Sequence, residues 1–318
     1  MDITVIGCGR WGSFIAWYLD KIGQTVTLYG RSSSKHMQEF YNSRSNGLLT
    51  LPDSVSLTGN LDSAAFSQVI VISVNSQGLR PLMEELKGYS LKNKTIVLCM
   101  KGIEIGSGKR LSEIAGENLD SSNSVAVWLG PGHVQEYLNS IPNCMVIDSE
   151  DDAVKERLVK EFSGELIRFY YGCDLIGNEV GAAAKNVIGI AAGMLDGLNL
   201  TTLKGALMSR GTREIARLIK AMGGSELSAY GLCHLGDYQA TVFSEFSHNR
   251  KFGECFVKGE NYGELAEGYY TVKALTELGG RYQVELPICQ AVYEILYQKK
   301  DIQTILEQLF ARNLKNEF

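Results

Sequence analysis

The sequence predicts an α/β domain built on a doubly wound parallel sheet, followed by an all-helical C-terminal domain. Roughly the first 170 residues alternate short, β-branched apolar runs with helical segments. Those runs are apolar at consecutive positions, which is typical of strands that are covered on both faces. From Asp174 onward the pattern changes to long amphipathic helices with few β-branched runs. We therefore expect two domains, residues 1–173 and 174–318.

Each expected element rests on its own run of residues. The apolar runs predict strands over 2–6, 25–29, 69–74, 95–100 and 125–129. Helices between such strands carry the chain back across the sheet and make neighbouring strands parallel. A helical stretch follows the first strand at 13–19. In the second half the helical periodicity covers 180–197, 204–222, 269–278 and 286–298.

Composition excludes several classes of protein. The 318 residues are 45% hydrophobic and 21% charged, as in a soluble globular protein. The net charge of −5 argues against nucleic acid as a partner. No apolar stretch approaches the ~20 residues of a membrane span, and no targeting segment precedes the first strand. Seven dispersed cysteines without a C-x-x-C pair favour reduced thiols in the cytoplasm and no metal site.

The most informative local motif lies at the end of the first strand. Residues 2–6 lead directly into Gly7-Cys8-Gly9-Arg10-Trp11-Gly12, and a helix follows. Strand, G-x-G-x-x-G turn and helix together form the dinucleotide-binding unit of a Rossmann-type domain. Gly7 permits the tight turn, Gly9 lets the backbone approach a pyrophosphate, and Gly12 lets the helix pack closely. The helix N-terminus then offers free N–H groups to the phosphates.

The end of the second strand indicates which dinucleotide is preferred. NAD-binding units usually carry Asp or Glu there, to hold the ribose 2′-hydroxyl. Here the stretch reads Tyr29-Gly30-Arg31-Ser32-Ser33-Ser34-Lys35, without a carboxylate. Cations and hydroxyls such as Arg31 and Ser32 suit a 2′-phosphate. We therefore expect NADP to be preferred, with NAD possible.

Several later motifs resemble one family, the NAD(P)-dependent glycerol-3-phosphate dehydrogenases. The motifs, in order, are Lys101-Gly102-Ile103-Glu104, residues 130–136, residues 178–188, residues 191–198, Ser209-Arg210-Gly211, Gly236-Asp237-Tyr238 with Thr241, Ser247-His248-Asn249-Arg250, and Glu267-Gly268. The resemblance runs over nearly the whole chain. It implies a Rossmann domain followed by a helical domain, a homodimer, a phosphorylated small-molecule substrate and a role in glycerophospholipid metabolism.

The resemblance also implies roles for individual residues. The chemistry would be hydride transfer between NAD(P)H and dihydroxyacetone phosphate or sn-glycerol 3-phosphate, which needs an acid and positive charge beside the carbonyl oxygen. Lys185 would be the general acid/base, Asp237 would orient it, and Lys101 would polarise the carbonyl. The implied substrate contacts are Lys101, Gly130, Gly132, Lys185, Asn186, Asp237, Thr241, Ser247, His248 and Asn249. The implied cofactor contacts are Gly7, Gly9, Arg10, Trp11, Gly12, Arg31, Ser32, Lys101, Val134, His248 and Glu267.

Simpler interpretations of the three catalytic candidates remain open. Lys185 stands in a stretch of small and apolar residues, where a cation is out of place unless its side chain extends to the surface. Lys101 could be an ordinary cation at the end of a strand. Asp237 follows Gly236 and could be a turn or N-cap residue.

The chain departs from the family pattern at positions implied to line the substrate site. The family usually has Arg where this chain has His248, and a shorter, partly neutral His holds phosphate less firmly. Arg250 is a candidate replacement. If His248 binds phosphate as an imidazolium, substrate affinity should weaken between about pH 6 and 8 more than in His248→Arg. Two family hydroxyls are replaced by Leu129 and Gly132, and a Pro by Asn75.

These departures leave two alternatives to the first interpretation. One keeps the hydride chemistry but applies it to a related phosphorylated ketone or polyol, because His248, Gly132 and Leu129 alter the phosphate site. The other is a catalytically silent regulator that binds NADP, since a fold does not fix a function.

Overall fold

The first half of the chain forms one eight-stranded sheet in the computed structural model, which describes residues 1–314, 316 and 317. The strand order is β3-β2-β1-β4-β5-β6-β7-β8. The strands are β1 (Asp2–Ile6), β2 (Thr25–Tyr29), β3 (Ser56–Thr58), β4 (Val69–Ile72), β5 (Thr95–Leu98), β6 (Ser124–Leu129), β7 (Asn143–Ser149) and β8 (Ile167–Tyr171). The predicted doubly wound α/β fold is confirmed.

The sheet differs from the expected one at its far edge. β1 to β6 pair in parallel, but β7 pairs antiparallel with β6, and β8 pairs in parallel with β7. The last two strands therefore run opposite to the other six. Neither β7 nor β8 was predicted from the sequence, and neither was the short β3.

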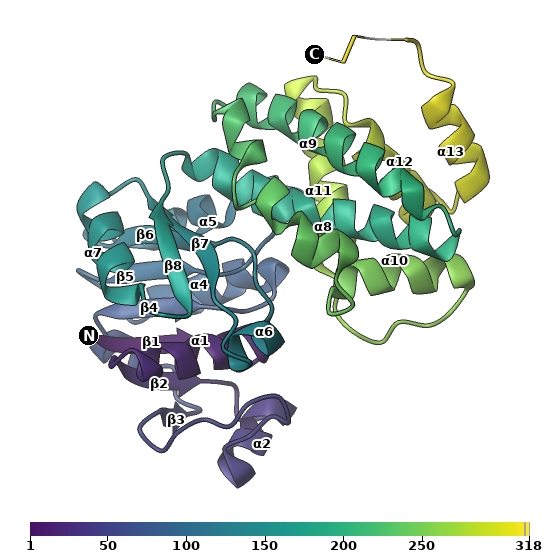
Figure 1. Cartoon of the computed structure of the whole chain (residues 1–318). Helices are drawn as coiled ribbons and strands as arrows, with labels where there is room; N and C mark the ends of the chain where they lie inside the picture. The colour runs from purple at the N-terminus through teal and green to yellow at the C-terminus, as the bar shows by residue number, and fades with distance from the viewer. Residues whose placement is uncertain (315, 318) are drawn as a thin grey trace.

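Helices cover both faces of this sheet (Figure 1). They are α1 (Arg10–Lys21), α2 (Lys35–Ser43), α3 (Ser63–Phe66), α4 (Leu79–Lys87), α5 (Leu111–Asn118), α6 (Val134–Leu138) and α7 (Asp152–Phe162). Successive residues of β4 pack into different apolar clusters, one on each face of the sheet. Val69 and Val71 of β4 pack with Phe14 of α1, whereas Ile70 and Ile72 pack with Met83 of α4. This double burial explains the continuous apolar runs in the sequence.

The second half is helical, as predicted. Its helices are α8 (Leu175–Gly197), α9 (Lys204–Ala221), α10 (His248–Lys258), α11 (Glu267–Tyr282), α12 (Pro287–Gln298) and α13 (Ile302–Phe310). Short 3₁₀ and π turns connect α9 to α10, including η4 (Leu235–Asp237) and η5 (Gln239–Phe243). α8 begins five residues before its predicted start at 180, and α11 extends beyond both predicted ends of 269–278.

Helix α8 is almost entirely buried, with the other helices packed around it (Figure 1). Glycines allow the closest approaches. A Cβ on Gly193 would overlap the carbonyl of Arg250, and a Cβ on Gly253 would overlap that of Ile190. On another side, a Cβ on Gly268 would crowd the carbonyl oxygen of Asn186. These contacts bring the N-terminal ends of α10 and α11 against the part of α8 that carries Lys185 and Asn186.

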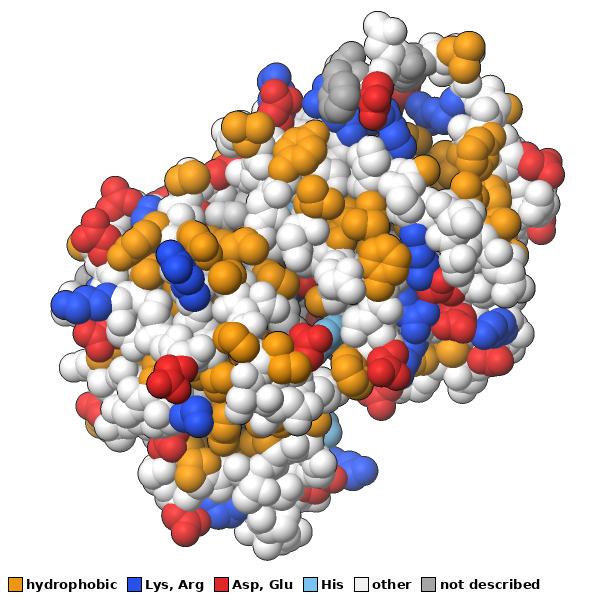
Figure 2. All heavy atoms as spheres, in the orientation of Figure 1, with side chains coloured by type: hydrophobic (Ala, Val, Ile, Leu, Met, Phe, Trp, Pro, Cys, Tyr) orange, Lys and Arg blue, Asp and Glu red, His pale blue; other side chains and the backbone are white. Residues whose placement is uncertain are grey.

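The visible face of the molecule carries acidic and basic side chains intermixed (Figure 2). Among the described residues, no helix is both long enough and apolar enough to cross a membrane.

Candidate active site

The glycine turn between β1 and α1 has the geometry that its sequence predicts. Gly7 has a φ of +116°, and a Cβ there would overlap the Ser73 carbonyl oxygen. A Cβ on Gly12 would overlap the Gly7 carbonyl oxygen. A Cβ on Gly9, by contrast, would meet no atom within 4 Å. The backbone at Gly9, which caps α1, is therefore open to a ligand, while Gly7 and Gly12 are required by packing.

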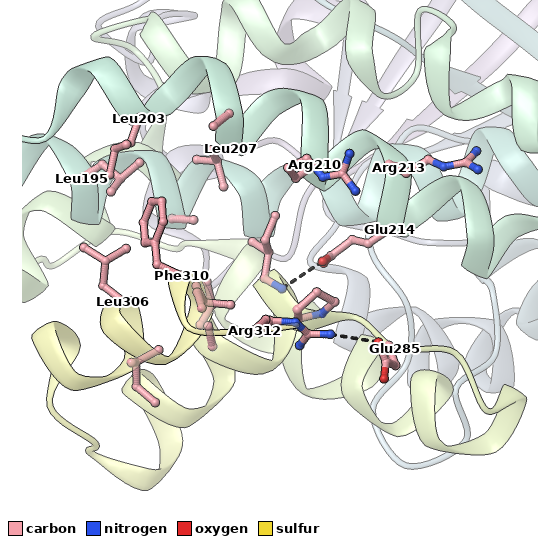
Figure 3. A pocket seen from close by; sticks show the side chains of 18 of the residues that line it. Leu195, Leu203, Leu207, Arg210, Arg213, Glu214, Glu285, Leu306, Phe310 and Arg312 are labelled. Carbon is pink, nitrogen blue, oxygen red and sulfur yellow. Dashed lines mark hydrogen bonds and ion pairs between the residues drawn. The ribbon is translucent and has the colours of Figure 1, made fainter. Parts of the chain in front are cut away.

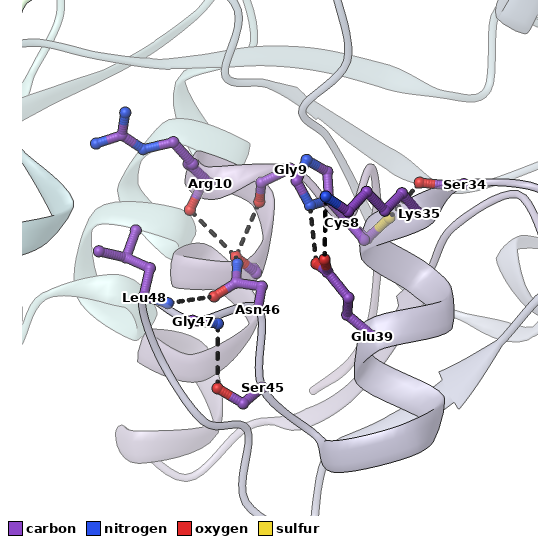
Figure 4. A network of polar contacts seen from close by, with 12 residues as sticks. Cys8, Gly9, Arg10, Ser34, Lys35, Glu39, Ser45, Asn46, Gly47 and Leu48 are labelled. Atoms are coloured by element: carbon purple, nitrogen blue, oxygen red, sulfur yellow. Dashed lines mark hydrogen bonds and ion pairs between the residues drawn. The ribbon is translucent and has the colours of Figure 1, made fainter.

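Polar side chains of α1 and of the loop after α2 form hydrogen bonds that hold the backbone of this turn (Figure 4). The Ser13 hydroxyl donates to the Gly9 carbonyl oxygen at 2.8 Å. Asn46 Nδ2 donates in turn to Ser13 Oγ at 3.1 Å. The Arg10 side chain extends away from these contacts, and the Trp11 ring packs 5.2 Å from that of Phe14. Trp11 thus serves in the packing of α1.

The end of β2 presents polar groups next to the glycine turn. Arg31 and Ser32 are both exposed. Ser34 caps α2, and its hydroxyl lies 3.6 Å from Cys8 Sγ of the turn. The segment that carries Arg31 is thereby held beside Gly9, with its guanidinium accessible from solvent.

The three catalytic candidates meet where the two halves of the chain join. Lys101 follows β5, Lys185 lies within α8, and Asp237 ends η4. Asp237 Oδ2 lies 2.7 Å from Lys101 Nζ and 2.9 Å from Lys185 Nζ. Lys185 is 9% exposed and Asp237 is 1% exposed. Lys185 is therefore not a surface lysine whose ammonium group extends into solvent. It forms an ion pair with Asp237 inside the protein.

The electrostatics of this cluster follow from burial and from the shared carboxylate. Burial lowers the pKa of Lys185, Asp237 raises it and Lys101 lowers it, and together these effects bring the pKa to about 8. Burial alone would raise the pKa of Asp237, but the two lysines outweigh it, and the pKa is lowered. Asp237 Oδ1 is buried and has no hydrogen-bond partner among the described residues. That oxygen is free to accept a hydrogen bond from a ligand hydroxyl.

A threonine and two asparagines form hydrogen bonds within the same cluster. Lys185 Nζ donates to Thr241 Oγ1 at 2.8 Å. Asn186 Nδ2 donates to the Lys101 carbonyl oxygen at 3.2 Å, and Asn249 Nδ2 donates to Asn186 Oδ1 at 3.1 Å. The structure thus brings Thr241, Asn186 and Asn249 together with Lys101 and Lys185.

The segment after β6 contacts the site through its backbone. The Gly130 carbonyl oxygen accepts from Lys101 Nζ at 2.6 Å. Gly132 has a φ of +148°, and a Cβ there would overlap the Tyr137 ring. Leu129 and Val134 are buried in the apolar cores of the first domain. The hydroxyl expected at 132 therefore has no room here, and the Leu129 side chain belongs to the core.

His248 contacts the glycine turn and a tyrosine of the helical domain. Its Nε2 contacts Arg10 NH1 of the glycine turn, and its Nδ1 contacts the Tyr262 hydroxyl. Because Arg10 can only donate, Nε2 must be unprotonated in this contact. Burial lowers the pKa of His248, and Arg10 adds to the effect. The geometry describes a neutral imidazole that links α10 to the glycine turn.

Two sequence neighbours of His248 have partners within the helical domain. Ser247 caps α10, and its Oγ accepts from the Arg250 backbone at 3.3 Å. The Arg250 guanidinium lies 2.7 Å from Asp196 Oδ2 and 3.3 Å from Glu254 Oε2. Arg250 is therefore held in an ion-pair cluster with Asp196 and Glu254, and its role as a replacement for the missing arginine stays a prediction.

Glu267 is the first residue of α11 and lies partly buried against the first domain. Its carboxylate accepts from the Ser76 backbone at 3.2 Å and from the Ser76 hydroxyl at 2.5 Å. Burial raises the pKa of Glu267, and both bonds from Ser76 oppose that rise. Glu267 therefore links the two domains beside Gly102.

Two site residues were missed by the sequence analysis. His133 Nε2 lies 2.8 Å from the Ala240 carbonyl oxygen, next to Thr241. Burial lowers the pKa of His133, and Lys185 is among its electrostatic neighbours. Tyr262 contacts His248, as described above. His133 stands inside the motif at 130–136, which was a usable signal, whereas nothing around Tyr262 marks it locally.

Comparison with known proteins gives a consistent result over the whole chain. Residues 2–155 match the N-terminal model of the NAD-dependent glycerol-3-phosphate dehydrogenases, and residues 174–307 match the C-terminal model. A glycerol-3-phosphate dehydrogenase (NAD(P)+) from Prosthecochloris aestuarii is 36% identical over 332 residues, covering 100% of both chains. A protein of the same name from Thermoanaerobacter is 35% identical, covering 100% of this chain and 99% of its own.

Solved structures agree with this result. The glycerol-3-phosphate dehydrogenase of Coxiella burnetii superposes with a TM-score of 0.92 at 27% identity, covering 98% of this chain and 99% of its own. The enzyme from Saccharomyces cerevisiae, at 21% identity, has the same fold with a TM-score of 0.80, covering 97% and 99%.

Proposed function

Because this chain belongs to the NAD-dependent glycerol-3-phosphate dehydrogenase family, we propose that it reversibly reduces dihydroxyacetone phosphate to sn-glycerol 3-phosphate with NAD(P)H. The observation that carries the proposal is the buried cluster of Lys185, Asp237 and Lys101 at the junction of the two domains. It combines an acid of suitable pKa with the positive charge that a developing alkoxide needs.

The residues present fit a nicotinamide dinucleotide. The open backbone at Gly9 and the first N–H groups of α1 suit a pyrophosphate. The cofactor supplies or accepts the hydride when it is bound. Arg31 and Ser32 are accessible beside the same turn, and this supports a preference for NADP, with NAD also used.

Lys185 acts as the general acid in the reductive direction. With a pKa of about 8 it is mostly protonated at pH 7, yet it gives up its proton more readily than an exposed lysine. It donates that proton to the carbonyl oxygen of the substrate as the alkoxide forms. In the oxidative direction the neutral amine takes the proton from the hydroxyl group.

Asp237 and Lys101 prepare the site for this step. The Asp237 carboxylate orients Lys185 through Oδ2 and keeps Oδ1 for a substrate hydroxyl. Lys101 adds positive charge beside the carbonyl oxygen. Thr241, Ser247 and Asn249 are proposed to contact the phosphate end of the substrate, with Asn186 and the Gly130 backbone beside them.

We do not propose a different substrate. That alternative rested on His248, Leu129 and Gly132. Leu129 belongs to the core, Gly132 leaves no space for a side chain, and His248 is bonded to Arg10 and Tyr262. A silent regulator would have no chemical need for a buried lysine of lowered pKa beside a carboxylate.

We further propose that the protein is a cytoplasmic homodimer active in glycerophospholipid metabolism, and that its domains divide between residues 173 and 174. The family resemblance supports the dimer and the metabolic role. Dispersed, unpaired cysteines support the compartment. The gap between the end of β8 at Tyr171 and the start of α8 at Leu175 supports the division.

The first test is the initial rate of NADPH and NADH oxidation with dihydroxyacetone phosphate, measured beside Lys185→Ala. Turnover that is faster with NADPH and falls at least 100-fold in the variant is expected. Tight NADPH binding without turnover would overturn the proposal in favour of a silent binding protein.

A further inference from the structure

The helical domain contains a cavity that is separate from the candidate active site. Its volume is about 1010 Å³, at the upper end of the ~300–1,000 Å³ that small-molecule sites usually have. The walls come from the C-terminal half of α8, from α9, α12 and α13, and from the segment after α13. None of the residues placed in the active site lines it.

The cavity has an apolar end and a basic end (Figure 3). The apolar end is lined by leucines of α8, of the turn before α9, of α9 and of α13, together with an aromatic ring; these are Leu195, Leu203, Leu207, Leu306 and Phe310. Four arginines line the other part of the wall, namely Arg210, Arg213, Arg217 and Arg312. In Figure 2, Lys and Arg side chains gather at the upper end of the helical domain, below the C-terminal tail.

The arginines of α9 form one stripe. Arg210, Arg213 and Arg217 are spaced by three and four residues, so they lie on the same face of the helix. Like charges at this spacing repel each other and destabilise a helix. Burial lowers the pKa of Arg217, and Arg213 and Arg210 add to this effect against the opposing Glu214.

Two of the three carboxylates in the wall are already engaged. Among the described lining residues, four arginines face three glutamates. Glu214 accepts from the Ile288 and Cys289 backbones at 2.9 and 3.0 Å, where it caps α12. Glu285 Oε2 lies 2.9 Å from Arg312 NH2. The remaining glutamate, Glu317, lies on the tail and meets Arg210 through its backbone carbonyl.

Two of the arginines donate to backbone oxygens. Arg210 NH1 donates to the Glu317 carbonyl oxygen at 3.3 Å, and Arg217 NH2 donates to the Glu285 carbonyl oxygen at 2.9 Å. A guanidinium has five N–H donors in a planar fork that matches a carboxylate. A single carbonyl oxygen uses one of them, so both side chains have donors to offer an anion.

We propose that this cavity binds an amphipathic carboxylate, a fatty-acid anion with its head on the arginines of α9 and its alkyl chain among the leucines and Phe310. The apolar end removes the chain from water, and burial of each methylene adds to affinity. The fork of Arg210 or Arg217 binds the head in two parallel hydrogen bonds. The ligand is distinct from the substrate of the active site, and the proposal does not depend on the reaction.

The test is calorimetric titration of the full chain with decanoate, compared with 1-decanol and with decyltrimethylammonium. Decanoate is expected to bind more tightly than the neutral and cationic chains. Arg210→Gln should weaken decanoate binding about tenfold, because it removes charge-assisted hydrogen bonds. Arg168→Gln, an exposed arginine on β8, is the matched control and should leave binding unchanged.

A second variant tests the apolar end. Phe310 is 70% exposed, so Phe310→Ser should fold normally and weaken decanoate binding without changing the preference for an anion. The proposal is overturned if the three chains bind equally or if Arg210→Gln behaves like Arg168→Gln. It is also overturned if decanoate does not bind and sedimentation shows a dimer that Phe310→Asp dissociates, since a second copy then covers this face.

Discussion

Lys185 Nζ lies 2.9 Å from Asp237 Oδ2, and both side chains are buried where the helical domain meets the sheet. Lys101 approaches the same oxygen to 2.7 Å. One carboxylate is therefore shared by two ammonium groups from different domains. The pKa of Lys185 depends on the balance between burial and Lys101, which lower it, and Asp237, which raises it.

The pH dependence of the reaction should report this balance. Reduction of dihydroxyacetone phosphate needs the protonated lysine, so kcat/KM should fall as pH rises through about 8. Oxidation of glycerol 3-phosphate needs the neutral amine and should gain activity through the same range. Initial rates between pH 6 and 10 in both directions test this, and parallel profiles would contradict the role of Lys185.

Substitutions of the two partners of Lys185 should shift the pH at which the reductive kcat/KM falls, in opposite directions. We call this falling part of the pH profile the reductive limb. Asp237→Asn removes the group that raises the pKa of Lys185, so the reductive limb should shift below pH 8 and kcat should fall about 10–100-fold. Lys101→Met removes a repelling charge and should shift the limb upward. The measurement is kcat/KM for reduction as a function of pH. A limb that shifts to higher pH in Asp237→Asn would show that Asp237 does not raise the pKa of Lys185.

Substitution by alanine should have different effects at two glycines of the glycine turn, Gly9 and Gly12. A Cβ on Gly9 has free space, so Gly9→Ala should keep the native Tm but lose NADPH binding, because the methyl group occupies the approach of the pyrophosphate. Gly12→Ala would overlap the Gly7 carbonyl oxygen and should lower the Tm as well. Thermal unfolding and NADPH titration separate the two effects. An equal loss of Tm in both variants would contradict the interpretation of Gly9.

Arg31 should decide between the two nicotinamide cofactors. Arg31→Ala is expected to weaken NADPH binding by roughly 1.5–3 kcal/mol, about 10–100-fold, as for a lost charge-assisted hydrogen bond. NADH binding should change less than about twofold, since NADH lacks the 2′-phosphate. Lys21→Ala, an exposed cation at the far end of α1, is the control. Equal losses for both cofactors would mean that Arg31 does not recognise the 2′-phosphate.

His248 should not titrate in the neutral range. Its pKa is lowered by burial and by Arg10, so its protonated form appears only below its ordinary pKa of 6.5. The KM for dihydroxyacetone phosphate should then follow parallel curves in the native protein and in His248→Arg between pH 7 and 8. A steeper loss of affinity in the native protein alone would restore the imidazolium hypothesis.

The strands that sequence reasoning missed differ from those it found. β7 contains Asp148 and Ser149, which are polar yet buried. Asp148 is tolerated there because its Oδ2 accepts from the Asp174 backbone at 3.1 Å and from Asn178 at 2.8 Å. β8 lies at the sheet edge and exposes alternate residues. Continuous apolar runs identify strands buried on both faces. β7 is buried over residues 145–149 but includes polar residues, and β8 is exposed at alternate positions, so neither shows an unbroken apolar run.

The candidate site was also predictable only in part. Ser247 and His248 look like a polar loop in the sequence, but they begin α10. Arg250 has the right charge and the right neighbours in sequence, yet its helical position directs it to Asp196. A helix places residues that are two apart on different faces, so the sequence distance from His248 could not show where Arg250 lies.

The sequence by itself determined the order of the two domains, the glycine turn and the absence of a carboxylate after β2, because these depend on local backbone geometry and on hydrophobic period. Only the tertiary structure decided that Lys101, Lys185 and Asp237 share one site, that His248 contacts Arg10, and that arginines of α9 line a separate cavity. Those neighbours are as many as 238 residues apart. Their meeting depends on how helices and sheet pack against each other, and packing leaves no periodic signal in the chain.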